Sequence, residues 1–333
     1  MTTWLDDVRS GHRVPVVQAP MAGASDARLA AAVSAAGALG TVAFAYGATP
    51  EDVATLSRAA GEGGPFGIGL MAWQLGESPE VLDAAVAQGP ALLSISFGDP
   101  TPWVGRARAL DPDIQLTCQV GTRDEALRAL DAGVDLLVAR GSEGGGHGRG
   151  GVSTLVLLQE VLDLAGKVPV LAAGGIATAR GMAAVLAAGA LGAWVGTPFA
   201  ACAESPFAEA YRAAMIAAGS DGTTYTRVFD VAQRLDWPEV YGGRALRNAT
   251  TERWDGRVGE LVETIAAGDP DGVTEGVRAA RAAADPQVAP VYAGQSVGLL
   301  VGHRTAAEVV AELGRGRVLL REAAARLPGA GTA

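Results

Sequence analysis

A short apolar run followed by a helical segment recurs along the first 200 residues, and this alternation restricts the chain to few folds. The runs are continuously apolar, as expected for parallel strands that helices cover. Eight runs occur with seven helical segments between them, and they span residues 14–20, 39–45, 66–72, 92–97, 114–120, 136–139, 168–172 and 193–196. This pattern favours an α/β fold, the (β/α)8 TIM barrel, over the alternative of an open doubly wound sheet.

The chain changes character after the eighth run. Residues 205–285 carry more charge, show helical patches and lack the strand-helix alternation. We predict that they form a helical insertion subdomain, a lid over one end of the barrel; the alternative is a set of ordinary surface helices. The barrel is assigned to residues 1–204 and 286–333, and an amphipathic helix over 305–325 is expected to complete its wall.

Composition excludes several classes of protein. The chain is 49% hydrophobic, 19% charged and has a net charge of -10, which predicts a globular protein without a nucleic-acid surface. Cys118 and Cys202 have no metal-ligand spacing, so we expect no metal site and a reducing, cytoplasmic location. No export signal is visible, and glycines and Pro198 interrupt the uncharged stretch 181–203, so we expect no membrane segment. An acidic, apolar barrel is compatible with a homodimer.

Residues 140–151 form a glycine cluster at the end of the sixth run, with seven glycines in twelve residues. Ordered glycine costs backbone entropy, so such a cluster indicates positive φ angles or close approach to a ligand. His147, one of three histidines in the chain, lies inside it and is the group best suited to proton chemistry near neutral pH. The alternative is a flexible loop with a surface histidine.

Two further glycine-containing segments end the seventh and eighth runs. Gly174 and Gly175 lead into a helix, and Gly196 precedes the hydroxyl of Thr197. In TIM barrels the loops after these two strands commonly cradle a phosphate with backbone N–H groups. No strand is followed by the dinucleotide fingerprint, which favours a mononucleotide over a dinucleotide.

Several motifs together resemble the nitronate monooxygenases, formerly called 2-nitropropane dioxygenases. The resemblance runs from about residue 13 to 302 and rests on Gln18-Ala19-Pro20-Met21-Ala22-Gly23, Phe66-Gly67-Ile68-Gly69-Leu70, Gln119-Val120-Gly121-Thr122, Gly145-Gly146-His147, Ala173-Gly174-Gly175-Ile176, Gly196-Thr197 and residues 292–299. It implies a TIM barrel with a helical insertion and noncovalently bound FMN at the C-terminal face of the barrel.

The resemblance also implies roles for individual residues. His147 corresponds to the active-site histidine of the family. The implied FMN contacts are Met21, Gly23 and Gly146 by the ring, Gln119 at its polar edge or ribityl chain, and Gly174, Gly175, Gly196 and Thr197 at the phosphate. Further implied cofactor contacts are Ala19, Gly69, Gly145, Gln295 and Ser296. Family members often carry Asn in place of Gly69 and an acidic residue in place of Arg140, and some carry Lys in place of Gln119.

The implied activity is the FMN-dependent oxidation of alkyl nitronates by O2 to a carbonyl compound and nitrite, and neutral nitroalkanes are a second substrate class. Two alternatives stay open. A related branch of the superfamily reduces enoyl-acyl-carrier-protein with NADH and FMN. A flavin-binding protein without catalysis is the other alternative, and the presence of His147 weighs against it.

Overall fold

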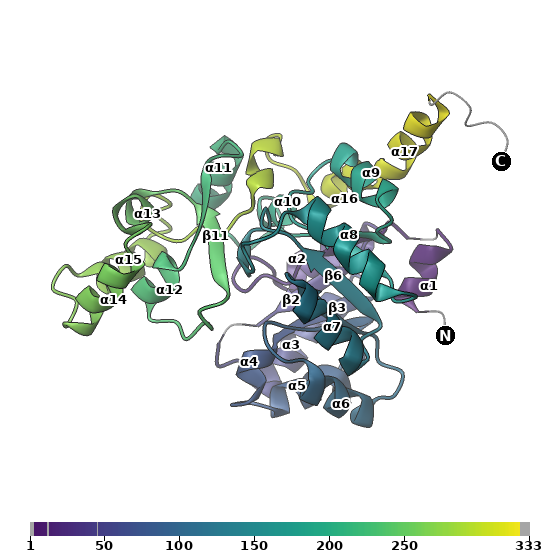
Figure 1. Cartoon of the computed structure of the whole chain (residues 1–333), viewed down its shortest axis with the longest axis horizontal. Coiled ribbons are helices and arrows are strands. Elements are labelled where there is room, and N and C mark those ends of the chain that lie inside the picture. The colour runs from purple at the N-terminus through teal and green to yellow at the C-terminus, as the bar shows by residue number, and fades with distance from the viewer. Residues whose placement is uncertain (1–2, 12, 45, 327–333) are drawn as a thin grey trace.

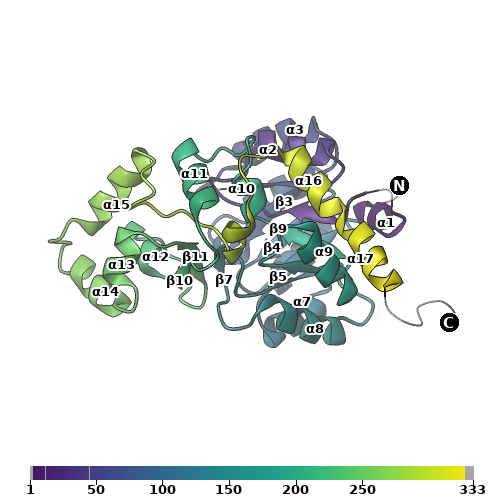
Figure 2. The same cartoon turned by 90° about the horizontal axis from the view of Figure 1, so that it is seen from above.

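The structure, a computed structural model, describes residues 3–11, 13–44 and 46–326. Its centre is a sheet of eight parallel strands in the order β1-β9-β8-β6-β5-β4-β3-β2 (Figure 2). The strands are β1 (Val16–Gln18), β2 (Gly40–Ala43), β3 (Phe66–Met71), β4 (Leu92–Ser96), β5 (Leu116–Val120), β6 (Leu136–Arg140), β8 (Val170–Ala173) and β9 (Gly192–Val195). A parallel bridge between Val17 and Leu39 links β1 to the start of β2 and closes the sheet. The predicted TIM barrel is confirmed, and the open sheet is excluded.

The barrel has two apolar layers. Val17, Leu92, Leu136, Leu171 and Trp194 fill its interior together with Trp4 of α1 (Trp4–Arg9), which packs into the same cluster. The other faces of the strands pack against the surrounding helices. Because both faces of each strand are buried, the sequence reads as continuous apolar runs.

Helices surround the barrel and follow most of its strands. They are α2 (Ala27–Ala35), α3 (Pro50–Gly61), α4 (Ala72–Leu75), α5 (Glu80–Ala87), α6 (Thr101–Leu110), α7 (Arg123–Ala132), α8 (Thr154–Ala165), α9 (Ala179–Ala187) and α10 (Thr197–Ala200). The single helix expected over 305–325 is divided into α16 (Ala306–Gly314) and α17 (Gly316–Ala325). Glycines flank the break, and glycine is a poor helix former. A side chain at Gly316 would lie 2.6 Å from Met182 Cβ, so α17 packs closely on α9.

The segment after the barrel lies at the end opposite to α1 (Figure 1). It contains α11 (Glu209–Ala217), β10 (Thr223–Thr226), α12 (Val228–Gln233), β11 (Gly242–Leu246), α13 (Ala249–Trp254), α14 (Val258–Ala266) and α15 (Val273–Ala282), and η1 (Gln295–Leu299) follows. The helices were predicted, but β10 and β11 were not. They form an antiparallel sheet with β7 (Gly146–Gly148) of the glycine cluster, in the order β10-β11-β7. The boundaries 205–285 and the lid function stay predictions.

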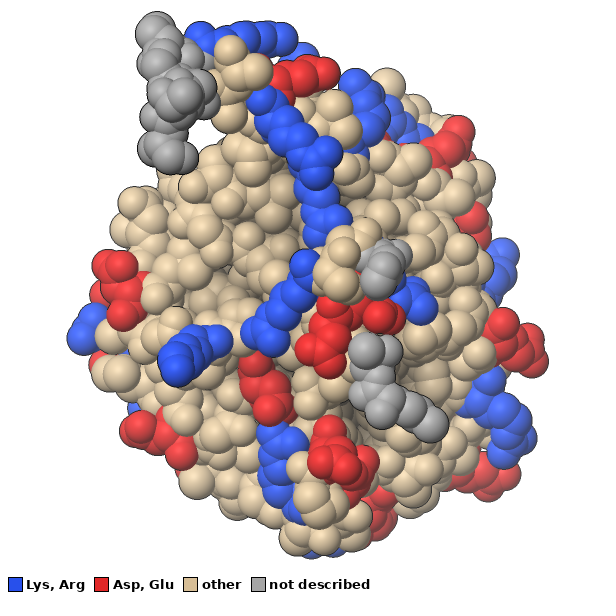
Figure 3. All heavy atoms as spheres, turned by 90° about the vertical axis from the view of Figure 1, so that its right-hand side faces the viewer, with Lys and Arg blue, Asp and Glu red and all other residues tan. Residues whose placement is uncertain are grey.

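The surface at the α1 end carries both signs of charge, with acidic and basic side chains interspersed (Figure 3). In the described part of the chain, no helix is both long and apolar enough to cross a membrane.

Candidate active site at the C-terminal end of the barrel

The loop after β1 lies across the C-terminal end of the barrel. A side chain at Gly196, at the end of β9, would lie 3.3 Å from Met21 Sδ and 3.7 Å from Ala19 Cβ. A side chain at Gly69 of β3 would lie 2.4 Å from Pro20. The asparagine that family members carry at this position therefore does not fit here, because Pro20 occupies its space. The structure brings Ala19, Met21, Gly69 and Gly196 together at this end.

The glycine cluster is wrapped around the buried side chain of Arg140 at the end of β6. Its guanidinium donates hydrogen bonds to the carbonyl oxygens of Gly144 (2.6 Å), Gly145 (3.1 Å), Gly146 (3.0 Å) and Arg149 (2.9 Å). Side chains at Gly144 and Gly148 would lie 2.7 and 2.6 Å from this guanidinium. Burial lowers the pKa of Arg140 to about 10, still well above neutral pH. A charged donor thus fixes the loop that carries His147, and part of the glycine content serves this wrapping.

A second network joins the glycine cluster to the end of β8. The Glu143 carboxylate accepts hydrogen bonds from the backbone N–H (2.8 Å) and hydroxyl (2.9 Å) of Thr154 at the start of α8. The Thr154 hydroxyl also lies 3.1 Å from the carbonyl oxygen of Gly174. Gly174 and Gly175 both have positive φ angles, 106° and 74°, a conformation that glycine adopts without strain.

The late segment packs onto this network. The N–H of Gly294 donates to the Thr197 hydroxyl (2.9 Å), and the N–H of Gln295 donates to the carbonyl oxygen of Glu143 (3.0 Å). These bonds bring Gly174 and Gln295 to the Glu143 network, and Thr197 to the neighbouring Gly294.

The ends of β8 and β9 have features of an anion-binding loop. No hydrogen bond between described residues uses the N–H groups of Gly175, Ile176 or Gly196 as donors. The loop after Gly175 leads directly to the N-terminus of α9, where the helix dipole favours an anion. Free N–H groups, positive φ angles and a helix start are the features that a phosphate cradle requires.

His147 lies on β7 and is held by a carboxylate from the insertion. Its Nε2 lies 2.7 Å from Oδ1 of Asp230 in α12, and the two side chains are 10% and 4% exposed. In the neutral imidazole next to an ionised carboxylate, which only accepts hydrogen bonds, Nε2 carries the proton and Nδ1 the lone pair. Nδ1 makes no hydrogen bond with a described residue. The arrangement of an imidazole oriented by a buried carboxylate is that of a general base.

Tyr292 completes the surroundings of this pair. Its hydroxyl lies 3.4 Å from Asp230 Oδ1, and its ring lies 5.2 Å from the His147 ring. Burial and the nearby Asp230 carboxylate raise the pKa of Tyr292 well above its usual value. Tyr292 therefore stays protonated and faces the carboxylate as a donor.

Trp237, from the insertion, covers one face of the His147 imidazole. The ring centroids are 3.7 Å apart and the planes are inclined by only 2°. Trp237 also contacts Trp73 (5.5 Å) and Phe97 (5.2 Å), which follow β3 and β4. Phe97 has a φ of 65°, a strained conformation for a residue other than glycine. Its carbonyl oxygen accepts a hydrogen bond from the backbone N–H of Trp73. Strain of this kind is concentrated at functional sites.

The remaining expected contacts lie around this centre. Gln119 is half-buried on β5, its N–H donates to Ser96 Oγ, and its side-chain amide has no partner among described residues. Gly146 pairs with Arg244 of β11, and Ser296 is buried in η1. Gly23 is exposed, with a φ of 80°, in the loop after β1.

Sequence reasoning missed Asp230, Trp237 and Tyr292 as site residues. Asp230 stands in an ordinary helical segment without a motif, and only folding brings it to His147 from 83 residues away. Trp237 precedes a proline in the charged region after the eighth strand. That region differs in composition from the barrel, but nothing in it indicates a catalytic role for Trp237. Tyr292 lies within one of the motifs of the resemblance but was given no role.

Comparison with known proteins shows which family the chain resembles. The family model for nitronate monooxygenase matches residues 9–88 and 77–316. The nitronate monooxygenase npaC of Metarhizium robertsii is 33% identical over 261 residues, which cover 70% of this chain and 72% of that protein. Two Mycobacterium tuberculosis relatives are matched over only 60% and 62% of their own lengths, less than two thirds of those proteins.

Solved structures with the same fold cover nearly the whole chain. FabK from Thermotoga maritima superposes with a TM-score of 0.78 and 25% identity, over 99% of both chains. The nitroalkane oxidase from Streptomyces ansochromogenes gives a TM-score of 0.75 and 28% identity, over 93% of this chain and 97% of that one.

Proposed function

The chain belongs to the nitronate monooxygenase family, a family of flavoprotein oxidoreductases, and from this we propose that it oxidises alkyl nitronates with O2 to a carbonyl compound and nitrite. The observation that carries the proposal is the His147–Asp230 pair, supported by the N–H groups of Gly175 and Gly196 at strand ends of the barrel, which donate to no described residue. A cytoplasmic location, a homodimer and the absence of nucleic-acid and membrane partners stay predictions.

We propose FMN as the flavin. The donor set suits one phosphate, from Gly174, Gly175, Gly196 and the N-terminus of α9, and Gln119 offers an unpaired amide for the polar edge of the ring. When bound, FMN supplies the electron-accepting chemistry that the side chains of the protein lack. Ala19, Met21, Gly23, Gly69, Gly145, Gly146, Thr197, Gln295 and Ser296 complete the proposed contact set.

His147 supports the two substrate forms in different ways. With a neutral nitroalkane, Nδ1 accepts the α-proton, and the Asp230 carboxylate stabilises the imidazolium that forms. A nitronate has already lost that proton, so its oxidation does not need Nδ1 as a base. Trp237 shields the imidazole from water, and its stacking fixes the plane of the ring.

The test is an anaerobic absorption spectrum of the purified protein, first with a nitronate and then, on a separate sample, with NADH. We expect the released cofactor to be FMN and the bound flavin to be bleached by the nitronate. Rapid bleaching by NADH alone would replace the proposal with the reductase alternative. A flavin that neither reagent bleaches would indicate a binding protein without this catalysis.

The residue-level test is His147→Asn. FMN should stay bound, because its proposed contacts are mainly backbone groups elsewhere. Turnover of a neutral nitroalkane should fall by roughly 10²-fold or more, the usual scale of a lost general base. Turnover of the preformed nitronate should fall much less, since no proton has to be removed from it.

A further inference from the structure

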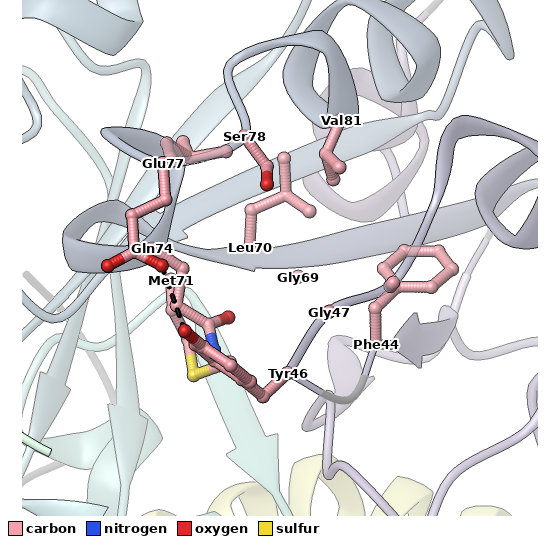
Figure 4. A pocket seen from close by; sticks show the side chains of 12 residues that line it. Phe44, Tyr46, Gly47, Gly69, Leu70, Met71, Gln74, Glu77, Ser78 and Val81 are labelled. Atoms are coloured by element: carbon pink, nitrogen blue, oxygen red, sulfur yellow. Dashed lines mark hydrogen bonds between the residues drawn. The ribbon is translucent and has the colours of Figure 1, made fainter. Parts of the chain in front are cut away.

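A cavity opens at the same end of the barrel as the candidate active site, beside the ends of β2 and β3 (Figure 4). Its volume is about 120 Å³, and its apolar lining includes Phe44, Leu70, Met71, Leu75 and Val81. That space exceeds several-fold what one water molecule needs. The cavity can therefore take a small organic group.

A row of packed aromatic rings extends from the wall of the cavity to the candidate active site. Gly69 lines it and also lies against Pro20, in the loop that reaches Gly196. Tyr46 lines it from the other side and stacks on Trp73, with centroids 6.2 Å apart. Trp73 in turn contacts Trp237, which covers His147. Tyr46, Trp73 and Trp237 thus form an aromatic row that leads from the cavity to the imidazole.

The only charged side chain among the described lining residues of the cavity is acidic. Glu77 lies at the rim, where its carboxylate accepts a hydrogen bond from the Tyr46 hydroxyl (2.9 Å; Figure 4), and this bond raises the pKa of Tyr46. None of the described lining residues is Lys, Arg or His. A substrate group that carries its own carboxylate would meet like charge here without a compensating cation.

We propose that this cavity binds the apolar substituent of the substrate, so that the enzyme prefers uncharged, longer-chain alkyl nitronates to short ones and to nitronates that end in a carboxylate. The proposal rests on the proposed function. The nitronate group lies at His147, and the alkyl chain follows the aromatic row into the cavity. Each methylene buried there should raise kcat/KM about three- to fourfold.

The experiment measures kcat/KM for the nitronates of nitroethane, nitrobutane and nitrohexane. It also measures kcat/KM for a nitronate that ends in a carboxylate and matches one of these in chain length. Ala48→Leu fills the cavity from its half-buried wall, and Ala59→Leu in α3 is the matched control outside it. We expect kcat/KM to rise with chain length in the wild type and the control and to level off in Ala48→Leu. Glu77→Lys should raise the ratio of kcat/KM for the carboxylate-bearing substrate to kcat/KM for the uncharged substrate of equal length about tenfold.

Two outcomes would overturn the proposal in distinguishable ways. If all nitronates are oxidised with the same kcat/KM, or if Ala48→Leu keeps the full chain-length dependence, the cavity does not bind the substituent although the proposed function stands. If no nitronate is oxidised, the proposed function fails and this inference fails with it. Melting temperatures of both alanine variants close to the wild type establish that the comparison concerns folded protein.

Discussion

Replacing Asp230 by asparagine tests whether the carboxylate makes His147 a base. Asparagine has nearly the same shape and keeps an oxygen that accepts a hydrogen bond from Nε2, but it removes the negative charge. In the structure Nε2 and Oδ1 are 2.7 Å apart, and the Asp230 side chain is only 4% exposed. The variant therefore changes the electrostatics of the pair more than its geometry.

The size of the effect follows from Coulomb's law. An imidazolium and a carboxylate whose charge centres lie roughly 4 Å apart attract each other by about 4 kcal/mol at an effective dielectric constant of about 20. This stabilisation exists only when His147 has taken up the proton. With about 1.4 kcal/mol for each factor of ten, we expect kcat/KM for a neutral nitroalkane to fall by about 10³-fold.

The assay compares the neutral nitroalkane with its preformed nitronate, at one pH, for the wild type, Asp230→Asn and Asp221→Asn. Asp221 is an exposed acid of the same insertion and serves as the control that removes one charge elsewhere. The nitronate should lose much less than the nitroalkane, since it transfers no proton to His147. Equal losses on both substrates, with FMN content and unfolding midpoint unchanged, would refute the general-base reasoning and leave Asp230 a positioning role.

Three further predictions concern the frame of the site. Arg140→Met should lower the free energy of unfolding by about 2 kcal/mol in urea titrations, because the buried Gly144 carbonyl loses its charged donor. The control Arg106→Met, which breaks the exposed ion pair with Asp83, should lower it by less than about 1 kcal/mol. Equal effects of the two substitutions would contradict a structural role of Arg140. Gly174→Asp should lose FMN in a fluorescence titration, because it places a negative charge beside the phosphate, and unchanged affinity would remove the cradle from the proposed site. Burial raises the pKa of Cys118 and of Cys202 to about 12, so both thiols stay protonated at pH 8 and a thiol reagent should label them only after denaturation; rapid labelling of the native protein would contradict their burial.

The barrel could be predicted from the sequence because its signal is local and repeated. The strands are apolar runs that are covered on both faces, and several helices begin at a capping residue, such as Asp26, Thr49 and Thr178. The family motifs lie at strand ends, so their order along the chain predicts which loops meet at the C-terminal face. The position of His147 in a glycine cluster marked it from the sequence alone.

The strands of the insertion could not be predicted from the sequence. Strands β10 and β11 are short, and their pairing partner β7 lies within the glycine cluster, about 75 residues or more before them. Glycine-rich segments give no hydrophobic alternation, so no strand pattern could be recognised there. The sheet exists because folding brings three weak strands together, which no local signal encodes.

Tertiary structure alone decided the electrostatics of the site. Asp230 and Trp237 come from a helix and a loop of the insertion, and only the folded chain places them on His147. The same holds for Arg140, which the sequence presents as a departure from the family and the structure shows as the donor around which the glycine cluster is wrapped. Sequence specifies residue types and local conformation, whereas hydrogen bonds and stacking between distant segments depend on distances that exist only once the barrel and the insertion are packed.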